Sequence, residues 1–159
     1  MTNASGLTHV DETGAARMVD VAGKDVTARV ATAAARLNTT AEVIAALRDE
    51  TLPKGDATAA ARLAGIMGAK KTPDLIPLCH PIALHGVKVE LSLGDTFADI
   101  TATTKTADRT GVEMEALTAA AVAGLTLIDM VKALDPSASM TDVRVLSKEG
   151  GKTGSWRRP

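Results

Sequence analysis

The segment from Val112 to Leu134 is the feature that most limits how this chain can fold. It has the pattern of one long helix, it is built mainly from Ala, Leu, Ile, Val and Met, and Asp135-Pro136 ends it. A helix that is apolar nearly all round is normally buried, so the rest of the chain must cover it. Its longest uncharged stretch, Ala116 to Ile128, falls short of the roughly 18 residues expected of a membrane span. We therefore expect a core helix and no membrane partner.

The remainder of the chain alternates between strand-like and helix-like patterns. Two further helices are expected after the candidate N-caps Thr40 and Asp56, the second running to about Lys71 with Gly65 and Gly68 packed closely against another element. Two-residue alternation predicts strands over 18–21, 27–38, 87–93, 98–104 and 143–146. Together these elements predict a two-layer α+β domain.

Two details of this pattern carry their own predictions. Leu63, Ile66 and Met67 form the apolar stripe of the second helix, which we expect to face the core. Three prolines between Thr72 and Pro81 restrict the backbone repeatedly, which favours a stiff, extended loop over 72–81.

Composition excludes several classes of protein. The 159 residues suffice for one domain, which we place at 17–156 after a flexible, polar tail at 1–16. Lys and Arg number 18 against 19 Asp and Glu, which disfavours a protein that coats nucleic acid or an anionic membrane. One Phe, one Trp and no Tyr leave no platform for base stacking. The N-terminus has neither the basic start nor the apolar core of a signal peptide, so a cytoplasmic location is expected.

Lys54-Gly55-Asp56 is the first place where polar residues exceed what packing requires. A lysine on a glycine-flanked turn at a helix start can reach an anionic ligand. The alternative is a solvated lysine beside an N-cap aspartate.

Cys79-His80 is the second such place, because prolines on both sides hold the pair rigidly. A ligand-contacting loop is one interpretation, and a buried Cys beside a hydrogen-bonded His is the other. A metal site that adds His85 has only three candidate ligands and no second Cys, so no metal is expected.

The long helix carries the third group. At 100° per residue, Glu115, Thr118, Thr126 and Asp129 form a polar seam, while Lys132 lies one turn beyond Asp129 and can pair with it. Such residues on a buried helix need a partner or a function, and a structural ion pair is the simpler alternative. Glu115 and Asp129 are about 21 Å apart along the axis, too far to grip one small group. Either the two residues serve different ends of a long ligand, or sites are completed across a subunit interface. We favour the second, because a short chain with an apolar central helix favours oligomerisation.

The C-terminal run is the fourth group. Lys148, Gly150-Gly151 and Lys152 could bind phosphate oxygens by charge and by amide donation, although the run does not fit a P-loop. A solvated basic tail is the alternative. From the residues alone, these groups predict an acid–base enzyme acting on a phosphorylated small molecule.

The same segments closely resemble one known family. DLIPLCHP, TGVEMEAL, IDMVKAL and SKEGGKTG, together with MVDV and KGDATAAARLAGI, look like the molybdenum-cofactor biosynthesis protein C family over about Leu7 to Trp156. The resemblance implies a ferredoxin-like α+β fold, with an antiparallel sheet packed on helices. It also implies a homohexamer, a trimer of dimers with active sites at subunit interfaces.

The resemblance implies an activity as well. Members of the family are lyases that convert (8S)-3',8-cyclo-7,8-dihydroguanosine 5'-triphosphate into cyclic pyranopterin monophosphate and release pyrophosphate. A non-catalytic, nucleotide-binding assembly subunit is the alternative. No cofactor is implied. The matching residues would be Asp129, Lys132 and Lys54 for catalysis, and Leu78, Cys79, His80, Glu113, Met114, Glu115, Arg29, Lys148 and Lys152 for substrate binding.

Overall fold

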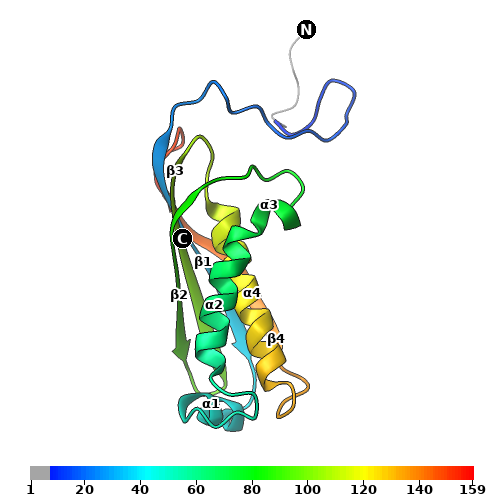
Figure 1. The fold of residues 1–159 in the computed structure, drawn as a ribbon, viewed down its shortest axis with the longest axis vertical. Helices are drawn as coiled ribbons and strands as arrows, with labels where there is room; N and C mark the ends of the chain where they lie inside the picture. Colours follow the sequence, from blue (N-terminus) through cyan, green and yellow to red (C-terminus); the bar gives the residue numbers. More distant parts are fainter. Residues whose placement is uncertain (1–7) are drawn as a thin grey trace.

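The computed structural model describes residues 8–159, which form one sheet with helices against one of its faces (Figure 1). In chain order the elements are β1 (Thr27–Asn38), α1 (Ala41–Arg48), α2 (Ala57–Lys70), α3 (Thr72–Leu75), β2 (Leu84–Leu93), β3 (Phe97–Asp108), α4 (Glu113–Val131), β4 (Ser139–Glu149) and β5 (Trp156–Arg157).

The sheet is antiparallel throughout, with the strand order β2-β3-β1-β4-β5. β1 pairs with β3 along its whole length, from Thr27 opposite Asp108 to Asn38 opposite Phe97. Helices lead from β1 to β2 and from β3 to β4, so the first four strands follow the β-α-β-β-α-β course of a ferredoxin-like domain. The expected fold class is confirmed.

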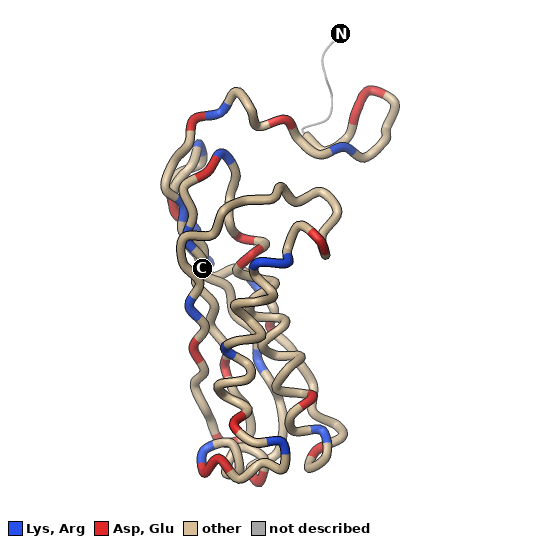
Figure 2. The backbone as a smooth tube through the Cα atoms, viewed as in Figure 1, with Lys and Arg blue, Asp and Glu red and all other residues tan. Residues whose placement is uncertain are grey.

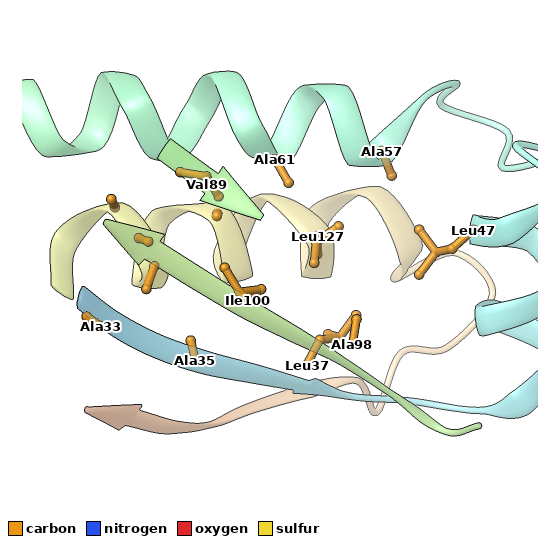
Figure 3. Close-up of a cluster of buried hydrophobic side chains, with 14 of the residues drawn as sticks. Ala33, Ala35, Leu37, Leu47, Ala57, Ala61, Val89, Ala98, Ile100 and Leu127 are labelled. Carbon is orange, nitrogen blue, oxygen red and sulfur yellow. The ribbon is translucent and has the colours of Figure 1, made fainter. Parts of the chain in front are cut away.

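The core lies between the sheet and α4 (Figure 3). Ala31, Ala33, Ala35 and Leu37 alternate along β1 and are at most 1% exposed, so this face of the strand is fully covered. The buried positions of α4 are mostly small, namely Ala116, Ala119, Ala120 and Ala123, with one large side chain, Leu127, among them. Small side chains on both layers allow the helix backbone to approach the sheet closely.

α2 packs on α4 through glycine. A Cβ built on Gly65 would lie 2.9 Å from the carbonyl oxygen of Ala119, and one on Gly68 would lie 2.8 Å from a side-chain carbon of Val122. The prediction of close packing at these two glycines is confirmed.

The predicted apolar stripe of α2 is wrong in part. Leu63 and Met67 are 63% and 65% exposed, and only Ile66 of the three packs against the core. The buried face consists instead of Ala57, Ala61, Gly65, Gly68 and Ala69, because the close contact with α4 leaves no room for larger side chains.

Of the remaining predictions of secondary structure, some are confirmed and others have the wrong bounds. The strand over 27–38 and the N-caps are confirmed, since Thr40 Oγ1 accepts from Val43 N at 3.3 Å and Asp56 Oδ1 from Ala59 N at 2.9 Å. β2, β3 and β4 extend beyond the predicted ranges, and β5 was not predicted.

Two predictions of local structure are wrong. The segment 18–21 is not a strand, because no neighbouring strand pairs with it. Residues 72–75 form the helical turn α3, with Pro73 in its first turn, where a missing N–H leaves no hydrogen bond unmade. A turn follows at 76–79, closed by the hydrogen bond from the Cys79 amide to the Ile76 carbonyl, and no regular element comes after it until β2.

The predicted tail at 1–16 lies partly outside the described residues, which begin at Thr8. Within the described part, residues 9–17 turn back on themselves. Val10 bridges Ala16, and the amide of Arg17 donates to the carbonyl of His9 at 2.9 Å.

By length and composition alone, α4 could cross a membrane, and it is the one such helix among residues 8–159. Half of its most apolar window is buried inside the protein, against the sheet and α2. Its hydrophobicity is therefore that of a core helix.

The helix contact predicts how substitution of glycine should act. Gly65→Ala should destabilise the protein by about 1–3 kcal/mol, because the new Cβ meets the backbone of Ala119 and overpacks the contact. Gly23→Ala is the matched control, since nothing lies within 4 Å of a Cβ at Gly23. Urea unfolding measures both. Equal stability of Gly65→Ala and the natural protein would show that α2 and α4 are not held this closely.

Candidate active site

A cavity of about 450 Å³ opens at the N-terminal end of α4. Three segments that are distant in sequence form its walls: the chain before β1, the loop after α3, and the start of α4. Six of the predicted site residues line it, namely Leu78, Cys79, His80, Glu113, Met114 and Glu115. The tertiary fold therefore brings together the two segments predicted to contact substrate.

Glu115 is the buried acid of this cavity. Its residue is 3% exposed although it lies in the first turn of α4. Burial, with a smaller contribution from the nearby charge of Glu113, raises the pKa of its carboxyl from 4.5 to about 7. A carboxyl group with a pKa near neutrality can both give and take a proton at physiological pH.

The Cys79-His80 loop is fixed by hydrogen bonds. The amide of Cys79 donates to the carbonyl of Ile76 at 3.1 Å, and His80 Nε2 lies 2.6 Å from the carbonyl oxygen of Val19. Burial raises the pKa of the Cys79 thiol, and the charge of Glu115 adds to the effect. The thiol is therefore a neutral group of the cavity wall at neutral pH.

The alternative of a metal site gains no support. Among residues 8–159 no group of three or more His, Cys, Asp and Glu side chains is arranged to hold an ion. His85 is exposed on β2 and is absent from the lining of the cavity that Cys79 and His80 share.

Basic groups border the cavity on the sheet side. Lys148 on β4 forms an ion pair with Glu113 at 3.2 Å, and both line a small adjoining cavity of about 80 Å³ with Arg29. Arg29 Nε donates to the carbonyl of Asp108 at 3.0 Å, which leaves the other guanidinium nitrogens for a ligand. Two of the three predicted basic residues thus lie beside the cavity.

The glycine turn after β4 brings the chain close to Arg29. Gly150 and Gly151 have φ of +90° and +77°, values that favour glycine, and a Cβ on either would collide with Ala28 or Arg29. Lys152 is exposed in the same turn and lines neither of these two cavities.

A second cluster lies at the opposite end of α4. Asp129 Oδ1 is 2.7 Å from Lys132 Nζ, and Asp129 Oδ2 is 2.9 Å from Lys54 Nζ. Lys54 also donates to the carbonyl of Asp129 at 2.9 Å. The hydrogen bonds from Lys132 and then Lys54 lower the pKa of the Asp129 carboxyl to about 2, so it is ionised at any physiological pH.

The two clusters do not meet within one chain. Residues 116–128 between them are uncharged (Figure 2), and the 14 positions from Glu115 to Asp129 span about 21 Å of helix. The polar seam predicted between them consists of hydroxyls satisfied inside the helix, because Thr118 and Thr126 donate to the carbonyls of Met114 and Val122 at 2.8 Å. All three predicted catalytic residues lie at the end away from the cavity.

Sequence reasoning missed several residues of the cavity. Val19, Val21 and Lys24 line it from the segment before β1, and Thr110 and Gly111 from the turn before α4. MVDV was interpreted as a strand, although His80 holds this segment at the cavity mouth through Val19. The sequence does offer one signal for this part of the cavity: Val19 and Val21 stand close to Lys24 in a segment that belongs to no helix or strand.

The fold is that of an α+β protein, and its two clusters place carboxyl and ammonium groups, which can exchange protons, at the two ends of α4. The model of the MoaC family matches residues 18–151. The chain belongs to the MoaC family.

Relatives of this chain agree along nearly its whole length. A protein of Streptomyces griseus is 65% identical over 99% of this chain and 89% of its own length. One of Nocardioides sp. is 62% identical over 96% of each chain, and one of Rhodospirillum rubrum is 56% identical over 96% and 93%. Each of the three is named cyclic pyranopterin monophosphate synthase.

The buried carboxyl predicts a pH dependence of stability. Because the pKa of Glu115 is higher in the folded state than its ordinary value of 4.5, the folded chain binds the extra proton. The stability that protonated Glu115 contributes to the folded state is fully present below pH 4.5 and is lost as pH rises through about 7. The free energy of unfolding should fall by up to roughly 3 kcal/mol across this range.

The measurement is the free energy of unfolding between pH 4.5 and 7.5 at fixed protein concentration. The natural protein should lose stability relative to Glu115→Gln across this window, since glutamine cannot ionise. Parallel curves for the two proteins would contradict a raised pKa at Glu115.

Proposed function

We propose that this chain is a cyclic pyranopterin monophosphate synthase of molybdenum cofactor biosynthesis. Its substrate is (8S)-3',8-cyclo-7,8-dihydroguanosine 5'-triphosphate, and its products are cyclic pyranopterin monophosphate and pyrophosphate. The observation that carries this proposal is Asp129 held between Lys54 and Lys132, a proton-transfer group in a chain whose relatives bear that enzyme name.

The Asp129 cluster supplies the acid–base chemistry. Opening and reclosing of the cyclised purine ring require protons delivered to and removed from nitrogen. The Asp129 carboxylate lies 2.9 Å from Lys54 Nζ and 2.7 Å from Lys132 Nζ, so it holds both ammonium groups in place for proton transfer to and from the substrate. Asp129 and Lys132 act jointly in this scheme, with Lys54 as a second proton donor or acceptor.

The cavity at the start of α4 holds the pterin-forming part of the substrate. Neither aromatic residue of the chain lines it, so the ring is held by hydrogen bonds from the Cys79-His80 loop and the Glu115 carboxyl. Arg29, Lys148 and Lys152 neutralise the triphosphate and the charge that develops on departing pyrophosphate.

A complete site needs two copies of the chain. The cavity and the Asp129 cluster lie at opposite ends of α4, so an antiparallel pairing of two helical layers would bring the cavity of one copy to the lysines of the other. Exposed apolar residues on the helical layer support such a contact, namely Leu63, Met67 and Leu125. The proposed assembly is a homohexamer, a trimer of dimers, acting in the cytoplasm.

The direct test is turnover. Purified protein incubated with the cyclised nucleotide should release pyrophosphate and form cyclic pyranopterin monophosphate. Tight binding of the nucleotide without release of pyrophosphate would instead favour a non-catalytic, nucleotide-binding subunit.

Substitution tests the role of the lysines. Lys132→Ala should lower kcat by about 10²–10⁴-fold, because a proton-transfer group is lost while the cavity stays intact. Lys88→Ala is the matched control, since Lys88 pairs with Glu90 at 2.8 Å on the far edge of the sheet and should keep normal turnover. Near-normal kcat in Lys132→Ala would remove Lys132 from the mechanism.

A further inference from the structure

A second cavity, of about 520 Å³, lies on the face of the sheet that the helices leave uncovered. Thr32 lies in its wall, between Ala31 and Ala33 of β1, whose side chains face the helical layer. The side chain of Thr32 therefore projects from the other face, where its hydroxyl is 3.0 Å from that of Thr103. The remaining wall comes from the end of the chain and β4, namely Arg144, Leu146, Ser147, Arg157, Arg158 and Pro159.

The charge of this cavity is positive. Arg144 is paired with Asp142 at 2.9 Å, whereas Arg157 and Arg158 form no ion pair with any carboxylate of residues 8–159. Arg157 and Arg158 therefore leave the cavity with an excess of positive side-chain charge. A chain with a net charge of −1 concentrates this excess at one cavity, which does not suit an extended nucleic acid.

The arginines are held in place by the backbone around them. Arg157 lies opposite Ser147 in the β4–β5 ladder. Arg158 donates from its amide to Leu146 O at 2.8 Å and from Nε to Val145 O at 2.7 Å, and its guanidinium lies 5.5 Å from the centre of the Trp156 ring. The guanidinium of Arg158, fixed in this way, loses little conformational freedom when a ligand binds.

We propose that this cavity is a binding site for an anion with two adjacent phosphate groups, such as inorganic pyrophosphate or the phosphate end of a nucleotide. Guanidinium groups recognise phosphate oxygens through paired, charge-assisted hydrogen bonds, and Ser147 and Thr32 add hydroxyl donors. The cavity shares no lining residue with either cavity at the start of α4. The site is thus separate from the proposed catalytic one and does not depend on the proposed function.

Trp156 provides a local reporter, because it is the only tryptophan of the chain and Arg158 stacks on it. The natural protein is titrated with inorganic pyrophosphate while tryptophan emission is recorded. We expect a saturable change, with pyrophosphate binding at least tenfold more tightly than inorganic phosphate. Equal affinity for the two anions, or no saturable change, overturns the proposal.

Substitutions test whether the change in tryptophan emission comes from pyrophosphate bound in the cavity lined by Arg157. Arg157→Gln should weaken pyrophosphate binding at least tenfold, and it should preserve the fold because the Arg157 side chain bonds to no other described residue. Arg48→Gln removes an exposed arginine of α1 that lines none of these three cavities, so it should not change the titration. Unchanged affinity in Arg157→Gln, or a comparable loss of affinity in Arg48→Gln, contradicts the assignment. Absence of turnover would leave this titration unaffected.

Discussion

The close approach of α4 to the sheet and to α2 is the constraint on which the rest of the structure depends. Alanine on both sheet and helix, and Gly65 at the crossing with α2, bring the backbones together without large side chains between them. The chain compensates for its lack of aromatic residues by packing many small groups tightly, which preserves dispersion contacts. This packing fixes α4 in place, and the two clusters of candidate site residues lie at its two ends.

The environments at these two ends shift the pKa values of two carboxyl groups in opposite directions. At the start of α4, burial raises the pKa of Glu115 to about 7. At its end, hydrogen bonds from Lys132 and Lys54 lower the pKa of Asp129 to about 2. Separated acid–base groups of this kind are typical of enzymes, in which one carboxyl group exchanges protons and another stays ionised to hold cations.

Much of the fold could be predicted from local patterns. Alternation along 27–38 gave the correct bounds of β1, because one face of that strand is fully buried and the other is not. The uniform apolarity of 112–134 correctly indicated a core helix. The segment 18–21 misled because four alternating residues resemble a strand whether or not a partner strand exists.

The prediction that the apolar stripe of α2 faces the core was wrong in part for a different physical reason. Leu63 and Met67 share a helix face with the spacing of core residues, but the sheet and α4 cover the small residues of α2 together with Ile66 and leave these two exposed. Spacing reports that a face is apolar, and it does not report which surface covers that face. Exposure of these two side chains is what a contact between copies of the chain requires.

The candidate site was predictable in its residues and not in its arrangement. Spacing alone places Lys132 next to Asp129, since residues three apart share a helix face. The contact of Lys54 with Asp129 spans 75 positions of sequence and follows only from the packing of α2 on α4. The same is true of Lys24 and Val19, which reach the cavity because the chain before β1 folds over it.

A site shared between two copies is the central claim, and mixing two inactive proteins tests it directly. One protein carries Lys54→Ala and Lys132→Ala, and the other carries Arg29→Ala and Lys148→Ala. After unfolding and refolding together in equal amounts, random pairing of two copies should restore about a quarter of the natural turnover, because half of the pairs are mixed and each has one intact site. If the refolded mixture stays as inactive as its components, the site does not combine the two ends of α4 from different copies.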